Sequence, residues 1–315
     1  MNDLAIGIDI GGTRIKAALT DREGKLYHEV NVPSEMEDGY DHFKTNLSQF
    51  VGELVKSGDG LVKGIGMGVA GLMNEDRSII LHAPNCHAIV GHQLAKDLAA
   101  ATGLMTVMDN DANMMAIGEG VCGSAKGSRF YIAITLGTGV GGAVISDGVL
   151  IRGITGGGGE LGHIPIARKG PRCGCGSVGC LEAFIGRPGI NRFISRNIPE
   201  YKGFGLKDLH GFAEKGDERA DLVFKYIGKH LGTGLAGLVN IFNPQLVIIG
   251  GGVSEAWKFI REDLVRELEA RAFKSYVAVL EVKPAELGNS AGIVGAGKLV
   301  WDEINKKRAA GWQPV

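Results

Sequence analysis

The chain has 315 residues and a formal net charge of -1, with 34 basic against 35 acidic side chains. This balance excludes a general electrostatic attraction to nucleic acid or to an anionic membrane, so we expect neither as a partner. Hydrophobic residues make up 44% and charged residues 22%, which excludes a disordered chain. The 51 glycines are more than twice the usual share of about 7% and indicate tight turns and close approach of backbone to a ligand.

The first half of the chain alternates between strand and helix patterns. Gly103 is the expected C-terminal stop of the second helix, because glycine readily adopts the left-handed conformation that ends helices. This alternation predicts an α/β layer fold. The predicted strands are Leu4–Ile10, Ile15–Thr20, Leu26–Val32, Gly64–Ala70 and Leu104–Met108, and the predicted helices are Phe43–Lys56 and His92–Ala101.

The second half repeats this order, again beginning with two strands around a glycine turn. The predicted strands are Arg129–Leu136, Ala143–Ile145 and Leu246–Ile249, and the predicted helices are Asp221–Phe242, Ser254–Phe273 and Ser290–Ile304. The repetition indicates a duplicated fold with a cleft between its halves. We expect an N-terminal domain of residues 1–115, joined by the last helix at 298–315, and a C-terminal domain of residues 116–297.

The N-terminus has no basic segment followed by a long apolar run, so no leader peptide is predicted. Apolar stretches stay under ten residues, whereas a bilayer-spanning helix needs about 20. Five cysteines, an odd number, argue against a secreted disulfide framework. We therefore expect a cytoplasmic protein.

Two glycine hairpins are candidate phosphate-binding loops. Asp9–Thr13 and Leu136–Gly139 each join two strands, and successive N–H groups with a threonine hydroxyl can point at phosphate oxygens. Either hairpin alone could be an ordinary turn, but their matching positions in the two halves favour phosphate binding. Gly250–Gly252 follows a buried strand and either contacts a base or ribose or simply forms a strand-to-helix turn.

The segment Gly137–Gly142 (GTGVGG) also matches the G-x-G-x-x-G dinucleotide fingerprint. That motif requires a helix to follow, so that the helix N-terminus faces the pyrophosphate. A β-branched strand follows here instead, which excludes the dinucleotide-binding interpretation. The chain also has no G-x-x-x-x-G-K-[ST] segment, so a P-loop is excluded.

Three cysteines and one histidine form a candidate zinc site. Cys173, Cys175 and Cys180 lie within eight residues, and His163 is ten residues upstream of the first. Three thiolates and one imidazole would complete a tetrahedral zinc shell with no open position, so the ion would be structural. The alternative is a set of free thiols in a glycine-rich loop, and the other two cysteines are expected to be unliganded.

Four segments in order along nearly the whole chain resemble the ROK family (repressors, open reading frames and kinases). They are Gly7–Arg14 (GIDIGGTR), Asp109–Asn113 (DNDAN), Glu160–His163 (ELGH) and Cys173–Glu182 (CGCGSVGCLE). The resemblance implies two actin-like (ribonuclease H-like) domains with a zinc loop, in which ATP and a sugar meet in the interdomain cleft. It also implies a sugar kinase that forms a homodimer.

The resemblance assigns site residues as well. Asp111 would be the catalytic base, and Asp9 would hold Mg²⁺ through water. The sugar contacts would be Gly71 (through its backbone), Asn85, Asn110, Asp111, Glu160, His163 and Glu182. The expected ATP contacts are Gly11, Gly12, Thr13, Arg14, Lys16, Gly137, Thr138, Gly139, Gly251 and Gly252.

Each polar residue in this set has a simpler interpretation. Asn110 or Asp111 could be only the N-cap of the helix that follows, and Glu182 could only complement a helix dipole. Glu160 could be a surface carboxylate and Asp9 a strand-end aspartate. Arg14 and Lys16 are equally compatible with solvated side chains on a hairpin.

We expect an ATP-dependent hexose kinase, with glucose as the first candidate because family glucokinases share the E-x-G-H and zinc-loop pattern. Kinases of N-acetylmannosamine, N-acetylglucosamine, mannose, allose and fructose carry nearly the same residues and remain alternatives. A sugar-sensing transcriptional regulator is the alternative from another class. Only six residues precede Gly7, which leaves no room there for the helix-turn-helix module that a repressor needs.

Overall fold

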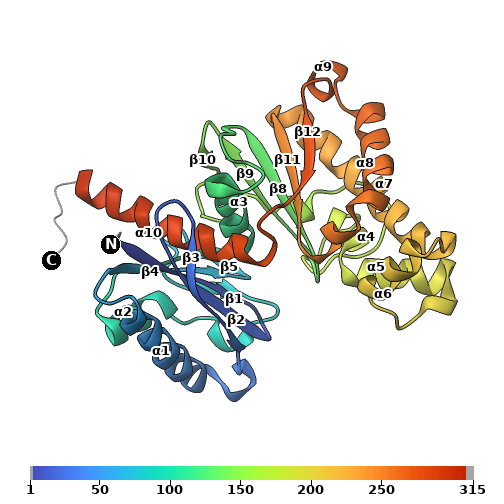
Figure 1. The fold of residues 1–315 in the computed structure, drawn as a ribbon. Coiled ribbons are helices and arrows are strands. Elements are labelled where there is room, and N and C mark those ends of the chain that lie inside the picture. The colour runs from blue at the N-terminus through green and yellow to red at the C-terminus, as the bar shows by residue number, and fades with distance from the viewer. Residues whose placement is uncertain (1–2, 310–315) are drawn as a thin grey trace. The chain divides into compact units, whose positions relative to one another are not determined.

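The computed structural model describes residues 3–309, and the chain divides into two compact units (Figure 1). The first unit contains Met1–Gly127, Leu150–Gly158 and Glu286–Val315, and the second contains Ser128–Val149 and Gly159–Ala285. The boundary predicted between residues 115 and 116 would cut helix α3 (Asp111–Cys122). This helix packs along its length on α10 (Ala291–Ala309), so it stays with the first unit.

The first unit is built on a five-stranded mixed sheet with the order β3-β2-β1-β4-β7. The first three strands pair antiparallel, whereas β1, β4 and β7 run parallel. The bounds are β1 Leu4–Ile10, β2 Arg14–Thr20, β3 Leu26–Pro33, β4 Val62–Val69 and β7 Thr106–Asn110. A two-stranded hairpin, β5 (Leu72–Met73) with β6 (Ile80–His82), follows β4.

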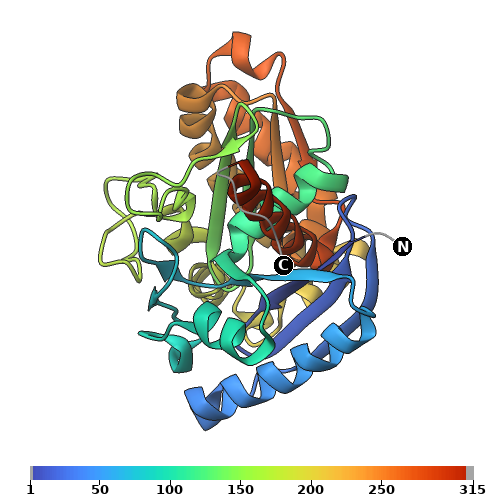
Figure 2. The ribbon, with the colours of Figure 1, turned by 90° about the vertical axis from the view of Figure 1, so that its left-hand side faces the viewer.

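Helices cover both faces of this sheet. Helices α1 (Tyr40–Ser57) and α2 (Leu94–Thr102) lie on one face, where Phe43 and Leu47 of α1 join the buried core of the strands. Helix α10 lies on the other face, against β1 and β4 (Figures 1 and 2). Short 3-10 turns span Met36–Asp38, His87–Ile89 and Gly288–Ser290.

Glycines bring α10 into direct backbone contact with the strands below it. A Cβ on Gly7 would stand 2.0 Å from the carbonyl oxygen of Ile293, and one on Gly66 would stand 1.9 Å from that of Ala296. Such distances exclude any side chain at either position. Part of the high glycine content therefore serves helix–sheet packing rather than ligand binding.

The second unit repeats the sheet, with the order β10-β9-β8-β11-β12. Here β8 and β9 pair antiparallel, while β8, β11 and β12 run parallel, as their counterparts do in the first unit. The bounds are β8 Tyr131–Leu136, β9 Val140–Ser146, β10 Val149–Leu150, β11 Leu246–Gly250 and β12 Glu281–Pro284. The duplication predicted from the sequence is thus visible in the topology.

The helices of the second unit are α4 Leu181–Ile185, α5 Arg187–Asn197, α6 Leu206–Glu214, α7 Glu218–Phe242, α8 Trp257–Arg271 and α9 Lys274–Val277. Short 3-10 turns span Leu161–His163, Pro199–Tyr201 and Gly252–Ala256. The last of these turns differs from the single helix predicted over Ser254–Phe273, because the chain turns tightly after β11 before α8 begins. Within residues 3–309, no helix is both long and apolar enough to cross a membrane.

Candidate active site

The β1–β2 hairpin of the first unit carries the first predicted phosphate loop. Asp9 pairs across the strands with Lys16, and the Gly11 N–H donates to the carbonyl oxygen of Arg14 at 3.0 Å. A Cβ on Gly12 would stand 2.3 Å from the carbonyl oxygen of Asn85. The turn is also held by Ser34, whose hydroxyl donates to the Gly12 carbonyl at 2.7 Å and whose N–H donates to that of Thr13 at 3.0 Å. The fold thus brings the hairpin tip and Asn85 together.

The two basic side chains of this hairpin are held by amide groups. Arg14 donates from Nε to Oδ1 of Asn31 at 2.5 Å and from Nη2 to the Asn31 carbonyl at 2.8 Å. Lys16 donates from Nζ to Oδ1 of Asn289 at 2.7 Å. The positions of both side chains are therefore fixed by hydrogen bonds to neutral groups.

The junction of β7 and α3 positions Asn110 and Asp111. The Asn110 side chain accepts from the N–H groups of Ala112 at 2.8 Å and Asn113 at 3.3 Å, and it donates to the Gly71 carbonyl at 3.1 Å. Asn110 is therefore the N-cap of α3, and Asp111 is the first residue inside the helix. The structure thus gives the capping position to Asn110 and not to Asp111.

Carboxylates gather beside this junction. Burial raises the pKa of Asp9 to about 6, and the charge of Asp111 adds to the rise while Lys16 opposes it. Burial also raises the pKa of Asp111. Cys86 is fully buried, and the pKa of its thiol is raised to about 11. The main cause is burial, and the negative charges of Asp111 and Asp9 add to it. This end of the first unit is a region of negative potential suited to a cation or to a proton-accepting base.

In the second unit, the ligand atoms of His163, Cys173, Cys175 and Cys180 all lie within 4.8 Å of one another. The Sγ atoms of Cys175 and Cys180 are 3.7 Å apart, and Sγ of Cys173 is 3.5 Å from Nδ1 of His163. A tetrahedron with Zn–S near 2.3 Å and Zn–N near 2.1 Å has S–S edges of about 3.8 Å and S–N edges of about 3.5 Å. The donor set and its spacing therefore fit zinc.

The loop that holds the cysteines is shaped by glycines. Gly176 and Gly179 have φ angles of 91° and 77°, which favour glycine, and a Cβ on Gly179 would stand 2.0 Å from the Ala167 carbonyl oxygen. Backbone hydrogen bonds from Ile166 to Gly179 and from Cys173 to Ser177, both 2.9 Å, close the loop. Three ligands thus come from one short, constrained segment.

His163 links this cluster to two carboxylates. Its Nδ1 faces Cys173 and lies 3.9 Å from Oε1 of Glu182, while its Nε2 lies 3.8 Å from Oε2 of Glu160. The other oxygen of Glu182 accepts from the Val140 N–H at 2.9 Å, at the start of β9. The structure therefore brings Glu160, His163 and Glu182 together, with one ring nitrogen toward the cysteines and the other away from them.

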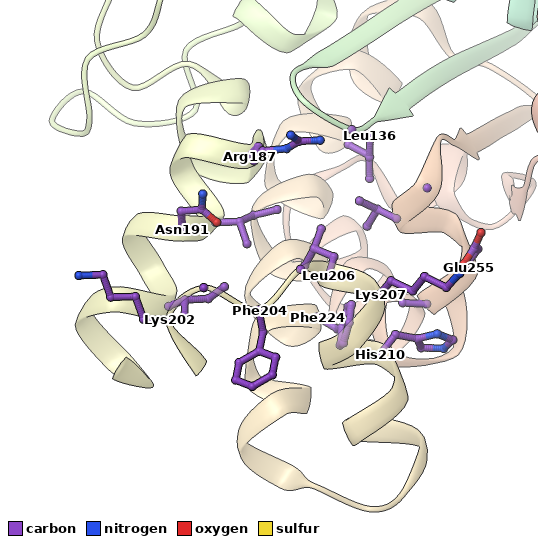
Figure 3. Close-up of a pocket in the computed structure, with 18 of the residues that line it drawn as sticks. Leu136, Arg187, Asn191, Lys202, Phe204, Leu206, Lys207, His210, Phe224 and Glu255 are labelled. Carbon is purple, nitrogen blue, oxygen red and sulfur yellow. The ribbon is translucent and has the colours of Figure 1, made fainter. Parts of the chain in front are cut away.

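The β8–β9 hairpin borders a cavity of about 800 Å³ within the second unit (Figure 3). Gly137 and Gly252 both line it, and the Thr138 carbonyl accepts from the Arg187 N–H at 3.0 Å. Gly251 has a φ of 79°, and a Cβ there would stand 2.2 Å from the Leu136 carbonyl oxygen. Other lining residues include Asn191, Lys202, Phe204, Lys207, His210 and Glu255. Two of the predicted glycine loops, Leu136–Gly139 and Gly250–Gly252, thus meet at this cavity of the second unit.

Sequence patterns did not indicate two buried carboxylates of the first unit, Asp109 and Glu119. Asp109 is bonded to Arg77 and Arg152, and Glu119 accepts from the N–H groups of Ser124, Glu286 and Leu287. Asp109 is the first residue of the Asp109–Asn113 motif, which was the one available signal. Its arginine partners lie 32 and 43 residues away along the chain, and no local pattern connects them.

Two duplicated α/β units with a cysteine-rich loop define a class of two-domain proteins, and comparisons with known proteins specify it further. The ROK family model matches residues 5–303. A glucokinase from Halalkalibacterium halodurans is 34% identical over 95% of this chain and 96% of its own length. The crystal structure of a ROK hexokinase from Thermus thermophilus has 30% identity and a TM-score of 0.83, covering 96% of this chain and 99% of that one.

A ROK family glucokinase from Streptomyces griseus, solved in complex with glucose and AMPPNP, is 33% identical, with a TM-score of 0.81. The similarity covers 95% of this chain and 99% of that one. The chain therefore belongs to the ROK family. The predicted α/β fold class of two actin-like units is confirmed.

Proposed function

We propose that this protein is an ATP-dependent kinase that phosphorylates a hexose hydroxyl, with glucose as substrate and glucose 6-phosphate as product. Membership of the ROK family and full-length similarity to two glucokinases support this activity. The observation that carries the proposal is the β7–α3 junction. There a partly buried aspartate with a raised pKa, Asp111, follows an amide fixed between the helix N-terminus and the Gly71 carbonyl.

Asp111 is proposed as the general base. A phosphoryl transfer depends mainly on positioning and charge neutralisation, with one aspartate accepting the proton of the attacking hydroxyl. A base works best when its pKa lies near the working pH, and burial shifts the pKa of Asp111 in that direction. Because Asn110 takes the capping role, the Asp111 side chain is not required to hold the helix N-terminus.

The sugar would be recognised by polar groups that can bridge neighbouring hydroxyls. Six side chains and one backbone group are proposed for this role: Gly71, Asn85, Asn110, Asp111, Glu160, His163 and Glu182. Nε2 of His163, which faces Glu160 rather than the cysteines, suits a hydroxyl partner. A metal on Nδ1 would fix the tautomer that leaves Nε2 protonated.

ATP would occupy the cavity beside the β8–β9 hairpin. Its volume of about 800 Å³ suits a nucleoside, and its lining combines aromatic and aliphatic side chains with a few polar groups, as ligand cavities generally do. The proposed contacts there are Gly137, Thr138, Gly139, Gly251 and Gly252. In the first unit, Gly11, Gly12, Thr13, Arg14 and Lys16 are proposed to face the phosphates.

Two metal ions belong to the proposal. Asp9 would hold Mg²⁺, and a divalent cation there would offset the repulsion between Asp9 and Asp111 that raises the pKa of Asp9. When bound, Mg²⁺ neutralises charge on the transferred phosphoryl group. His163, Cys173, Cys175 and Cys180 would hold a structural Zn²⁺. Its closed shell leaves no position for a reacting water, so its role would be to fix His163.

The homodimer and the cytoplasmic location stay predictions. Neither property is needed for the proposed reaction.

The test is ADP release from Mg-ATP across a panel of hexoses and N-acetylhexosamines, with the Asp111→Asn variant as the blank. We expect sugar-dependent ADP release with glucose in the wild-type protein only. A larger rate with N-acetylmannosamine, N-acetylglucosamine, mannose, allose or fructose would support the kinase activity but assign it a substrate other than glucose. No release with any sugar, although the protein binds both sugar and ATP, would contradict the kinase and favour the sensor.

A further inference from the structure

The Asp109 carboxylate is the centre of a buried polar cluster in the first unit. Its side chain is only 3% exposed, and five donors bind it. Oδ1 accepts from the Asn110 N–H and from Nδ2 of Asn113, both at 2.8 Å. Oδ2 accepts from Nη1 of Arg77 at 3.1 Å and from Nε and Nη2 of Arg152 at 2.9 and 2.8 Å. Every lone-pair direction of the carboxylate is therefore used.

The five donors come from three separate parts of the chain. Asn110 and Asn113 belong to the β7–α3 junction, which also carries Asp111. Arg77 lies in the turn between β5 and β6. Its φ of 57° is in the left-handed region, which residues other than glycine rarely adopt. Arg152 comes from the segment Leu150–Gly158, which belongs to the first unit. One carboxylate thus ties two distant loops to the junction.

Each of these loops is also connected to the proposed sugar contacts. The β5–β6 hairpin begins one residue after Gly71, whose carbonyl accepts from the Asn110 side chain. The segment with Arg152 continues through Gly153 to Gly158 and reaches Glu160 two residues later. A Cβ on Gly157 would stand 2.7 Å from Cδ1 of Leu72, so the segment lies directly against the hairpin.

We propose that Asp109 is a positioning residue for the sugar site. By accepting from the Asn110 N–H it fixes the backbone from which Asn110 and Asp111 project, and through Arg77 and Arg152 it holds the two loops that lead to Gly71 and Glu160. This inference rests on the proposed sugar-kinase function. It adds a residue that contacts no reacting atom but sets where the base and the sugar contacts stand.

The charges explain why an aspartate is needed at this position. A planar guanidinium forms two parallel hydrogen bonds to a carboxylate oxygen pair or, as here, directs Nε and Nη2 at one oxygen. Asparagine has the same size but carries no charge, and its NH₂ group would face either the two arginines or the Asn110 N–H. The cluster would then lose donors on one side whichever way the amide turned.

The experiment measures kcat and both KM values by ADP release for wild-type protein, Asp109→Asn, Arg152→Gln and Arg152→Lys. We expect Asp109→Asn to lower kcat by about 100-fold and to raise the sugar KM about tenfold, because displacement of reacting groups by about 1 Å has effects of this order. The ATP KM should stay within about twofold of wild type, since none of the proposed ATP contacts donates a hydrogen bond to Asp109.

The Arg152 variants keep the test valid if Asp109→Asn folds poorly. The Arg152 side chain is 27% exposed, and after its replacement Arg77 still binds the buried Asp109 carboxylate. Arg152→Gln should raise the sugar KM about tenfold, and Arg152→Lys should fall between Gln and wild type because it keeps the charge and one donor. The matched control is Asp147→Asn, which removes the exposed ion pair with Arg129 and should behave as wild type.

A purely structural role would lower the melting temperature and the active fraction while both KM values stay unchanged. That result, or variants with wild-type kcat and sugar KM, would overturn the inference while the kinase itself stands. A wild-type protein that phosphorylates no sugar would overturn the proposed function and this inference with it. A selective change in kcat and sugar KM, graded from Lys to Gln at position 152, would support it.

Discussion

The two glycine hairpins occupy equivalent places in equivalent sheets, yet their surroundings differ. The β1–β2 hairpin lies among charges: Asp9 and Lys16 face each other across its strands, and Asp111 raises the pKa of Asp9. The tip of the β8–β9 hairpin carries no charged side chain of its own, since its residues are Gly137, Thr138 and Gly139. The Arg187 N–H donates to the Thr138 carbonyl there, the Glu182 carboxylate accepts from the Val140 N–H, and the tip borders a cavity of about 800 Å³.

The glycines themselves serve different purposes in the two hairpins. A Cβ on Gly12 would collide with the Asn85 backbone, so this glycine is required by the fold. A Cβ on Gly137 would meet no protein atom within 4 Å, so packing within the protein does not require glycine at this position. The two units thus share the same turn, but only the first hairpin carries charged side chains, Asp9, Arg14 and Lys16, on the strands that form it.

The largest effect should come from the charged side of this comparison. Asp111→Asn removes the proposed base while keeping its size, and general-base catalysis contributes about 10²–10⁴-fold to rate. We expect kcat to fall by that factor while sugar binding, measured by calorimetry, stays within about threefold of wild type. Unchanged turnover would remove Asp111 from the chemistry and with it the division of roles between the two units.

The Cys/His cluster proposed to bind zinc belongs to the second unit, and loss of the ion should act through His163. Cys175→Ser should eliminate bound zinc, measured by elemental analysis, and weaken sugar affinity about 10–100-fold because the imidazole is no longer oriented. Cys122→Ser is the matched control, since Cys122 lies outside the cluster and should leave metal content unchanged. Full zinc content in Cys175→Ser would show that this thiol is not a ligand.

The hairpin glycines allow a direct comparison of fold and ligand. Gly12→Ala should destabilise the protein by about 1–3 kcal/mol, because the backbone of Asn85 must move to admit a methyl group. Gly137→Ala should leave the melting temperature unchanged and raise the ATP KM about tenfold, because the methyl group occupies space reserved for phosphate. Denaturation and ADP release measure the two effects separately. A wild-type ATP KM in Gly137→Ala would mean that phosphate does not approach this turn.

The smallest effect concerns Asp9 in the absence of divalent cations. Its pKa is raised from 3.8 to about 6 in the folded state, so the folded state binds the proton more tightly than the unfolded chain does. The contribution of Asp9 to stability is therefore fully present below about pH 4 and is lost as the pH rises through about 6. Asp9→Asn should remove this decline and raise the melting temperature by about 2–5 °C at pH 8, with no difference near pH 4.

Calorimetry at both pH values measures the Asp9 effect, and Asp147→Asn serves as the exposed control. Magnesium added to wild-type protein at pH 8 should reproduce part of the stabilisation, because the cation replaces the proton beside the ionised carboxylate. A constant difference between Asp9→Asn and wild type at all pH values would exclude titration of Asp9 as its cause.

Local patterns predicted the regular elements well. Leu4–Ile10 is a strand with the predicted bounds, and Gly103, with a φ of 72°, ends α2 as expected. Strand β9 is longer than the predicted Ala143–Ile145 because it includes Gly141 and Gly142. Glycine weakens a strand pattern, but at Gly142 it makes room for Leu161, whose Cγ would stand 2.6 Å from a Cβ.

Sequence patterns missed helices α5 and α6, which are short (11 and 9 residues) and bury few side chains. The pairs that they do bury, Ile190 with Ile194 and Leu209 with Ala213, are spaced four residues apart, as one helix face requires. For the site, the predicted grouping of three cysteines with His163 agrees with their ligand atoms lying within 4.8 Å of one another. The cluster around Asp109 could not be predicted, because it forms only when two loops far along the chain arrive at the same carboxylate.

The return of α10 to the first unit has a consequence for how the protein is made. The second unit, within residues 128–285, is synthesised before α10. Strands β1 and β4 are synthesised first, but α10, which packs on one face of their sheet, is synthesised last. The contact surfaces at Gly7 and Gly66 are shaped for the α10 backbone alone. The first unit therefore begins to be synthesised first but can complete its fold only at the end of synthesis. A nascent chain that stops before Ala291 lacks α10 and leaves apolar surface of β1 and β4 exposed, which chaperones would have to protect.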